Sequence, residues 1–296
     1  MPEALDTRCA VIALAGKPNS GKSTLLNAIV GAKLAITSPK PQSTRQPVVG
    51  IHTEGATQLV FVDPPGLLDE PRYLLQQAMM EQVTDALRGA DAILYLSTLA
   101  DGPPPPLEQL VPADALKRQP VATVLTGADL VPQRERPAVE PPTFLVGSPT
   151  GEGVQEVLGW CREQARPGAF RHDPDDVSTQ PLRFFVAEFV REAAFELLDE
   201  ELPYALAAEV DEFREHSDPV YIRVTVHVER ESQKGIVIGS NGRTIKQLGA
   251  LARQRIENLL GERVYLDLWV KVLPKWRRSP QRLREFGFPL PGTRST

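Results

Sequence analysis

Residues 16–23 have the types and the spacing of a phosphate-binding loop. Their sequence, Gly-Lys-Pro-Asn-Ser-Gly-Lys-Ser, fits the pattern G-x-x-x-x-G-K-[ST], follows an apolar run at 9–15 and opens a helical pattern. In such a loop the backbone N–H groups and the helix N-terminus hold phosphate oxygens, Lys22 neutralises the β- and γ-phosphates, and Ser23 ligates Mg²⁺. The alternative is a glycine-rich turn that binds nothing, and the flanking patterns argue against it. The candidate phosphate-binding residues are Gly16, Lys17, Pro18, Asn19, Ser20, Gly21, Lys22, Ser23 and Thr24.

A second candidate segment ends another apolar run. Residues 58–63 read as a buried strand that ends in Asp63, and Asp63-Pro64-Pro65-Gly66 resembles the D-x-x-G segment of switch GTPases. There the aspartate holds Mg²⁺ through water, and the glycine N–H meets the γ-phosphate. An ordinary Asp-Pro turn at a strand end is the alternative. We expect Asp63, Pro64, Pro65, Gly66 and Leu67 to line the nucleotide site.

The elements that must position these residues alternate between strands and helices. Short continuous apolar runs typical of buried parallel strands occur at 9–15, 59–62, 92–96, 121–125 and 144–146. Helical patterns occupy 23–30, 73–88 and 154–164. This alternation predicts an α/β domain, a mostly parallel sheet with helices on both faces, over residues 1–166.

The rest of the chain has a different pattern. Residues 167–181 are polar and rich in proline and glycine, which favours a linker. Residues 182–273 then read as helix, strand, strand, helix, Gly239-Ser240-Asn241-Gly242, helix and strand, with strands at 204–213, 221–228 and 264–272. A basic, proline-punctuated tail covers 274–296, and its Trp276 either packs on the domain or stacks on a base.

Taken together, the chain resembles the Era family of GTPases over nearly its whole length. The resemblance rests on residues 16–23, 38–45, 63–66, 229–239 and 266–272. It implies a P-loop GTPase domain followed by an α+β type II KH domain, and Thr44 as the switch residue that completes the Mg²⁺ shell. It also implies a K⁺ ion held partly by Asn19, for which a turn residue is the alternative. Lys22, Thr44, Asn19 and Gly66 are the residues to which the resemblance gives catalytic roles.

The resemblance further implies partners. These are GTP and GDP, the small ribosomal subunit and its 16S rRNA near the 3′ end, with peripheral association with the inner membrane; we expect a cytoplasmic monomer. In KH domains the Gly-x-x-Gly loop approaches the backbone of about four single-stranded nucleotides. A tight helix–helix turn is the alternative. The expected RNA-binding residues are Lys234, Ile236, Ile238, Gly239, Ser240, Asn241, Gly242, Arg243 and Lys246, with Val237 in the same apolar groove.

The guanine-selecting part of the pattern is incomplete. Where the family has N-K-x-D, this chain has Thr126-Gly127-Ala128-Asp129, and Gly147-Ser148 stand at the later base-contacting loop. Asp129 retains the carboxylate that accepts hydrogen bonds from guanine, whereas Thr126 is expected to lose the tie to the phosphate loop. Leu67 cannot orient water as a glutamine does, so slow hydrolysis is expected. The alternative function is an RNA-binding assembly factor whose nucleotide domain is degenerate.

Charge separates the two parts of the chain. The 296 residues carry a net charge of −5, but residues 1–218 carry −14 and residues 219–296 carry +9. The whole-chain charge argues against nucleic acid, whereas the basic C-terminal part favours an RNA partner. The composition is globular, Cys9 and Cys161 lack motif spacing, no apolar run is long enough to cross a membrane, and residues 1–6 do not form a signal peptide.

Overall fold

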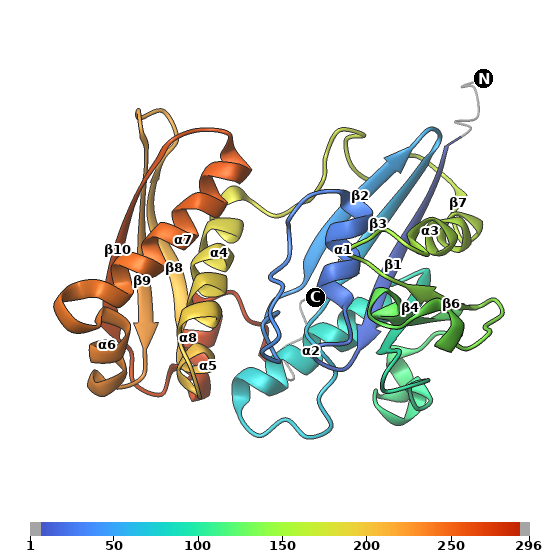
Figure 1. Cartoon of the computed structure of the whole chain (residues 1–296), viewed down its shortest axis with the longest axis horizontal. Coiled ribbons are helices and arrows are strands. Elements are labelled where there is room, and N and C mark those ends of the chain that lie inside the picture. Colours follow the sequence, from blue (N-terminus) through green and yellow to red (C-terminus); the bar gives the residue numbers. More distant parts are fainter. Residues whose placement is uncertain (1–6, 291–296) are drawn as a thin grey trace. The chain divides into compact units, whose positions relative to one another are not determined.

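The computed structural model describes residues 7–290, and these divide by their contacts into two compact units. The first unit comprises residues 7–35, 44–72 and 76–179, and the second comprises 36–43, 73–75 and 180–290. Each unit has its own sheet (Figure 1). The predictions for the first six residues and for the last six residues of the tail lie outside the described residues.

The first unit is built on a mostly parallel sheet in the strand order β2-β3-β1-β4-β5-β6. Its strands are β1 (Arg8–Gly16), β2 (Val48–Glu54), β3 (Thr57–Asp63), β4 (Ala92–Thr98), β5 (Val121–Thr126) and β6 (Thr143–Val146). β2 is the exception to the parallel order, because it pairs antiparallel with β3. The sequence pattern did not reveal this edge strand, whose run of apolar residues is interrupted by Gly50, His52 and Thr53.

Helices cover both faces of this sheet, as predicted for an α/β domain. They are α1 (Lys22–Val30), α2 (Leu74–Gly89) and α3 (Val154–Glu163). Val83 and Leu87 of α2 pack with Ala13, Ile93 and Tyr95 of the central strands in one buried cluster. The strands β1 and β3 and their helices place residues 16–23 and 63–66 at the same carboxyl edge of the sheet, because parallel strands end together.

The segment expected to be a linker is attached to the first unit over most of its length. The strand β7 (Arg166–Pro167) pairs with β1, and the Gln58 side chain bonds the backbone of Arg171 and His172. Further along, the Val177 carbonyl accepts from the Ile51 amide. The second unit resumes at residue 180.

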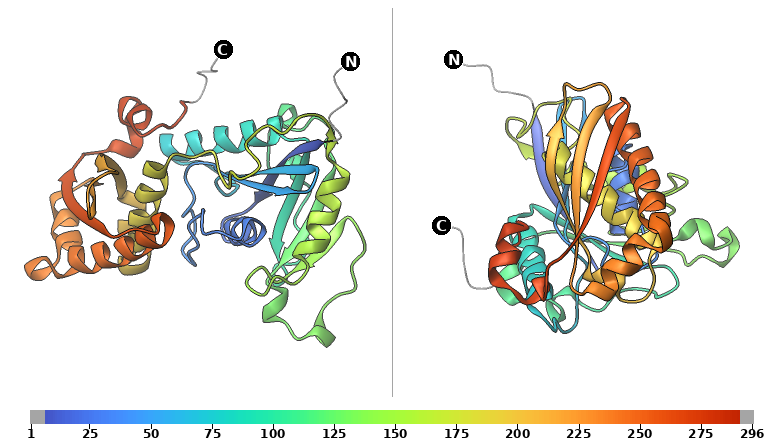
Figure 2. Two further views of the ribbon diagram at one scale, coloured as in Figure 1. Left: turned by 90° about the horizontal axis from the view of Figure 1, so that it is seen from above. Right: turned by 90° about the vertical axis from the view of Figure 1, so that its left-hand side faces the viewer.

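The second unit carries a three-stranded sheet in the order β10-β9-β8 (Figure 2, right). Its elements are α4 (Leu182–Leu197), α5 (Leu202–Ala205), β8 (Ala207–Arg214), β9 (Val220–Val228), α6 (Glu231–Ile238), α7 (Arg243–Leu260) and β10 (Val264–Val272). β8 is antiparallel to β9, and β9 is parallel to β10. The predicted order of elements is confirmed, except that residues 202–205 form a helical turn where the first strand was expected to begin.

The start of the tail folds onto this second unit. Trp276 is fully buried, its indole N–H donates to the Ala205 carbonyl at 2.8 Å, and Phe286 packs edge-on against its ring. A short helix, α8 (Pro280–Glu285), follows. Packing, rather than base stacking, is therefore the role of Trp276. No helix within residues 7–290 combines the length and the apolar character needed to span a bilayer.

Candidate nucleotide and RNA sites

The phosphate loop connects β1 directly to α1. Lys22 is buried at the first position of α1, and its Nζ donates to the carbonyls of Gly16 (3.1 Å) and Lys17 (3.2 Å). Burial lowers the pKa of Lys22, and the nearby Asp63 carboxylate opposes this shift. The ammonium group is thus held by two carbonyls that a phosphate can replace, since Lys is a common phosphate ligand in such loops.

Gly66 approaches this loop closely. A Cβ on Gly66 would lie 2.7 Å from the Pro18 nitrogen, so only glycine fits here. The amide of the next residue, Leu67, donates to the Gly16 carbonyl at 2.9 Å. The Leu67 side chain is buried in the cluster formed with α2, so it is directed away from solvent and cannot orient a water molecule.

Three oxygen-bearing side chains from distant parts of the chain meet beside Lys22. The Ser23 hydroxyl donates to the Asp63 carboxylate at 2.6 Å, and it lies 3.0 Å from the Thr44 hydroxyl. Asp63 is fully buried, and its Oδ1 has no hydrogen-bond partner among the described residues. Burial raises the pKa of Asp63 to about 6, although Lys22 and the bond from Ser23 lower it. This set of hard oxygen donors fits Mg²⁺.

The base end of the site is formed by the residues that follow β5. The Thr126 hydroxyl donates to the Ser20 carbonyl at 3.0 Å, which corrects the expectation that Thr126 loses the tie to the phosphate loop. Gly127 adopts a left-handed conformation (φ 77°), and Ala128 is fully buried. The asparagine amide is absent, but a shorter hydroxyl makes the same connection between the two loops.

Asp129 and Ser148 lie together at this end. A Cβ on Gly147 would stand 3.0 Å from the Asp129 Cβ, so the two loops are in close contact. Asp129 Oδ1 and the Ser148 hydroxyl are both buried and have no hydrogen-bond partner among residues 7–290. Unpaired buried polar atoms are costly, so these two atoms indicate a ligand that bonds them. A guanine ring has the donors that Asp129 requires.

Further predicted nucleotide-site residues belong to the phosphate loop or to residues 63–66. Lys17 forms an exposed ion pair with Asp69 at 3.4 Å, and Asn19 is in the left-handed region (φ 66°), as a turn residue can be. Pro64 and Pro65 are buried between Asp63 and Gly66, whereas Thr24 continues the first turn of α1.

The second candidate site lies on the KH-like unit. The Gly-x-x-Gly loop joins α6 to α7, and Gly239, Asn241 and Gly242 all have left-handed φ values of 71°, 52° and 73°. A Cβ on Gly239 would lie 2.9 Å from the Thr244 backbone nitrogen, whereas one on Gly242 would meet nothing closer than 3.9 Å. Gly239 is therefore required by the fold, and Gly242 leaves its outer side open to a ligand.

A groove of about 330 Å³ runs beside this loop, between α7 and the edge strand β10. Of the predicted RNA-binding residues, Lys246 lines this groove. Ile236 is 58% exposed on α6, whereas Val237 is buried in the core, which corrects its expected place in the groove. The lining residues of the groove that the sequence analysis missed are Ile245, Gly249, Ala250, Arg253, Tyr265, Leu266 and Leu268.

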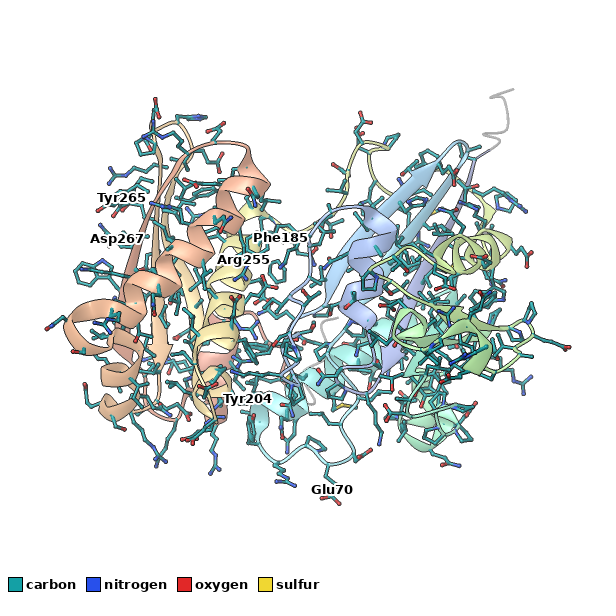
Figure 3. The ribbon with its side chains drawn as sticks, in the orientation of Figure 1. Glu70, Phe185, Tyr204, Arg255, Tyr265 and Asp267 are labelled. Carbon is teal, nitrogen blue, oxygen red and sulfur yellow. The ribbon has the colours of Figure 1, made fainter. Side chains whose placement is uncertain are left out.

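The missed residues had a signal in the sequence. Gly249 stands three residues after Lys246, and Arg253 stands four residues after Gly249, which places all three on the same face of α7. Leu266 and Leu268 belong to the alternating apolar face of β10. Tyr265 and Asp267 are on the same strand (Figure 3), and Asp267 bonds Tyr221 and Arg223 of the neighbouring β9.

Comparisons with known proteins identify both kinds of domain. A family model described as 50S ribosome-binding GTPase matches residues 11–126, and a KH domain model matches residues 201–277. GTPase Era of Carboxydothermus hydrogenoformans is 38% identical over 289 residues, covering 94% of this chain and 96% of that protein. GTPase Era of Thermotoga maritima is 37% identical over 286 residues, covering 93% and 95%.

Two solved structures match the whole fold. A variant of Aquifex aeolicus Era bound to GDP·AlF4⁻ superposes with a TM-score of 0.88 at 32% identity, covering 96% of this chain and 100% of that chain. Era in complex with MgGDPNP and nucleotides 1506–1542 of 16S ribosomal RNA has a TM-score of 0.87 at 32% identity, with the same coverage. From its P-loop, its KH unit and these full-length similarities, this chain belongs to the Era family of GTPases.

Proposed function

We propose that this protein is an RNA-binding GTPase that acts in assembly of the small ribosomal subunit and binds small-subunit rRNA near its 3′ end. The observation that carries the proposal is the convergence of Ser23, Thr44 and Asp63 beside the buried Lys22, on a chain that also has a KH groove. A related Era has been solved with MgGDPNP and a 16S rRNA fragment, which supports both ligands.

The residues of the phosphate end have separable roles. Lys22 neutralises the β- and γ-phosphates, and the Gly66 amide donates to the γ-phosphate. Ser23, Thr44 and Asp63 would hold Mg²⁺, which would supply charge neutralisation during phosphoryl transfer. Because the Leu67 side chain is packed in the core, intrinsic hydrolysis is slow.

Guanine selection rests on Asp129. Its free Oδ1 accepts from the base, and hydrogen bonds to charged groups contribute about 1.5–3 kcal/mol each. Gly127 removes the lysine stem that packs along the base, so affinity is reduced by about 1–3 kcal/mol relative to an intact motif. Calorimetric titration with GTP, GDP, ATP and XTP tests this assignment. We expect GTP and GDP to bind more tightly than ATP and XTP, and equal affinities would contradict it.

RNA binding distinguishes the proposed switch from the alternative function, a scaffold whose nucleotide domain has no useful turnover. For a switch, RNA affinity differs between the GTP-bound, GDP-bound and nucleotide-free protein, because the γ-phosphate orders the segments around Thr44 and Gly66. Identical affinities in all three states would favour the scaffold. Gly242→Asp should abolish RNA binding and leave GTP binding intact, since a Cβ at this position meets nothing closer than 3.9 Å.

Three further assignments complete the proposal. K⁺ bound partly by Asn19 accelerates hydrolysis, and equal GTP turnover in potassium and sodium buffers would show instead that Asn19 is only a turn residue. The protein acts as a monomer, which analytical ultracentrifugation checks. Any association with the inner membrane is peripheral and is measured by flotation with anionic lipid vesicles.

A further inference from the structure

Leu130 is an exposed apolar residue at the base end of the nucleotide site. It directly follows Asp129, and 82% of its surface is accessible to solvent. Among the exposed large apolar side chains of residues 7–290, the next most accessible is Tyr265 at 60%, and its ring stacks on Tyr221. Single exposed leucines are common on protein surfaces, so the place and the conformation of Leu130 decide whether it has a role.

The local backbone brings the Leu130 side chain over Gly127. Residues Ala128–Leu130 form a 3₁₀ turn in which the Leu130 amide donates to the Gly127 carbonyl at 3.0 Å. A Cβ on Gly127 would lie 3.7 Å from Leu130 Cδ1, which is the one atom outside the adjoining residues within 4 Å of it in the described part of the chain. A Leu130 methyl group therefore lies against the side of Gly127 from which a side chain would project.

Polar groups that need a ligand lie next to this turn. Asp129 Oδ1 and the Ser148 hydroxyl are buried, and within residues 7–290 neither has a hydrogen-bond partner. The Thr126 hydroxyl joins the same segment to the Ser20 carbonyl of the phosphate loop. A ligand that extends from the phosphate loop to Asp129 therefore reaches the turn that carries Leu130.

A purine ring suits this combination of polar and apolar groups. The polar edge of the ring can bond Asp129, whereas its two faces are apolar and gain from contact with apolar side chains. The free atoms of Asp129 and Ser148 are polar and suit the edge, so a face needs an apolar partner. A protein partner is disfavoured, because one exposed side chain is far smaller than the roughly 800 Å² that each partner buries in a stable interface.

We propose that Leu130 packs against a face of the guanine ring and is a base-contacting residue of the nucleotide site. The inference rests on guanine binding through Asp129, as proposed above, and separates two contributions to it. Bonds from the ring edge to Asp129 distinguish one base from another, because they depend on which atoms the base carries. Contact with Leu130 adds similar affinity for every purine, since it depends on apolar area.

The test measures the affinities of Leu130→Ser for GDP, inosine diphosphate and pyrophosphate by calorimetry. GDP and inosine diphosphate should both bind about tenfold more weakly, because about half the burial of a leucine side chain is lost. The ratio of these two affinities should not change, since both purines present the same faces. Pyrophosphate should bind as it does to the unmodified protein, because it fills the phosphate loop and has no base.

Three further variants complete the comparison. Leu130→Met keeps an apolar side chain and should retain the affinity for GDP within about threefold. Val177→Ser removes another exposed apolar side chain of the first unit and should leave all three affinities unchanged. Asp129→Asn should reduce the preference for GDP over inosine diphosphate, which Leu130→Ser leaves intact. Equal melting temperatures check that each variant is folded.

A direct measurement follows the methyl groups of Leu130 by NMR, assigned with the Leu130→Met spectrum. A methyl group over the face of an aromatic ring is shielded by the ring current. The Leu130 resonances should therefore move upfield when GDP binds and stay in place when pyrophosphate binds. This readout depends on contact with the base and not on the stability of any variant.

The outcomes separate this inference from the function on which it rests. If the unmodified protein does not bind GDP, or if Asp129→Asn keeps the full preference for GDP, the proposed guanine site fails. If that site stands but Leu130→Ser binds GDP as tightly as Val177→Ser does and the methyl resonances do not move, Leu130 is not a base contact. An equal loss of affinity for pyrophosphate would also overturn the inference, because it would show an effect on the phosphate loop.

Discussion

Asp63 illustrates how a single residue can be prepared for a ligand. Its carboxylate is fully buried at the end of β3, and only one of its two oxygens is bonded, to Ser23. Burial without full pairing is why the pKa rises to about 6. The ionised form is costly until a cation is bound, so the site favours binding of Mg²⁺ and nucleotide together.

This shift predicts a pH dependence of metal binding. Because the folded-state pKa is raised to about 6, the carboxylate is protonated below that pH, and protons then compete with Mg²⁺. In the presence of saturating GDP, the affinity for Mg²⁺ should be nearly constant above pH 7 and fall up to tenfold per unit below pH 6. Isothermal titration between pH 5 and 8 measures this.

The matched control for that titration is Asp63→Asn. This variant should bind Mg²⁺ weakly, and any pH dependence left in it reports protonation of the nucleotide's own phosphates. If the unmodified protein and the variant have parallel pH profiles, Asp63 is not the titrating group.

Thr126 makes a second prediction at the residue scale. Its hydroxyl connects β5 to the Ser20 carbonyl, and both atoms are buried. Thr126→Val keeps the shape but removes the donor, leaving the carbonyl unpaired at a cost of about 1–3 kcal/mol. We expect a lower melting temperature and weaker GDP binding. Thr123→Val, on the same strand, is the control and should change neither; equal effects at both positions would show that the Thr126 bond is unimportant.

At the scale of elements, helix α4 holds a loop of the second unit at several points. Arg191 donates to the Ser43 carbonyl at 2.7 Å, Glu192 accepts from the Thr37 amide at 3.1 Å, and Lys40 bonds the Leu198 carbonyl at 2.5 Å. Thr44 directly follows Ser43, and its hydroxyl lies 3.0 Å from the hydroxyl of Ser23. We therefore expect ordering of Thr44 by a nucleotide to affect the adjoining residues 37–43, which α4 contacts.

The bond between Glu192 of α4 and Thr37 can be tested with a matched pair of variants, at Glu192 and Glu196. Both are on α4 and both pair with Arg255, but of the two only Glu192 is bonded to Thr37 among the described contacts. Glu192→Ala should increase hydrogen exchange at residues 37–43 and reduce the difference in RNA affinity between the GTP- and GDP-bound protein. Glu196→Ala should do neither. Identical hydrogen exchange in both variants would show that Glu192 does not hold residues 37–43.

At the scale of the whole molecule, the N-terminal and C-terminal parts of the chain carry opposite net charges. The net charge of −5 is the sum of an acidic part and a C-terminal part of +9, and the latter carries the KH groove. Lys246 and Arg253 line this groove and contribute its two positive charges.

This division predicts opposite salt responses for the two ligands. If these two cations each contact one phosphate of a single strand, the plot of log RNA affinity against log salt should have a slope of about −1.4. Affinity for GTP, measured at constant Mg²⁺, should vary much less, because its phosphates are held in a buried loop where screening is weak. A slope near zero for RNA would contradict recognition through the backbone.

The sequence predicted the contiguous motifs well. Residues 16–23 form the phosphate loop because a strand, a turn and a helix that follow each other directly leave little freedom in their arrangement. The order of helices and strands in the KH unit could be predicted for the same reason, since its alternating strands and its Gly-x-x-Gly turn are local features. The edge strand β2 and the groove wall on β10 were harder, because their partners are remote in the chain.

By itself, the sequence determined the phosphate chemistry, the order of elements and the opposite charges of the two parts, since these depend on residue type and short-range spacing. Tertiary structure decided the rest. It brought Thr126 to Ser20 across 106 positions, turned Leu67 into the core and buried Trp276 against Ala205. The physical reason is that burial and pairing depend on which remote residues come together, and only the packed fold fixes those partners.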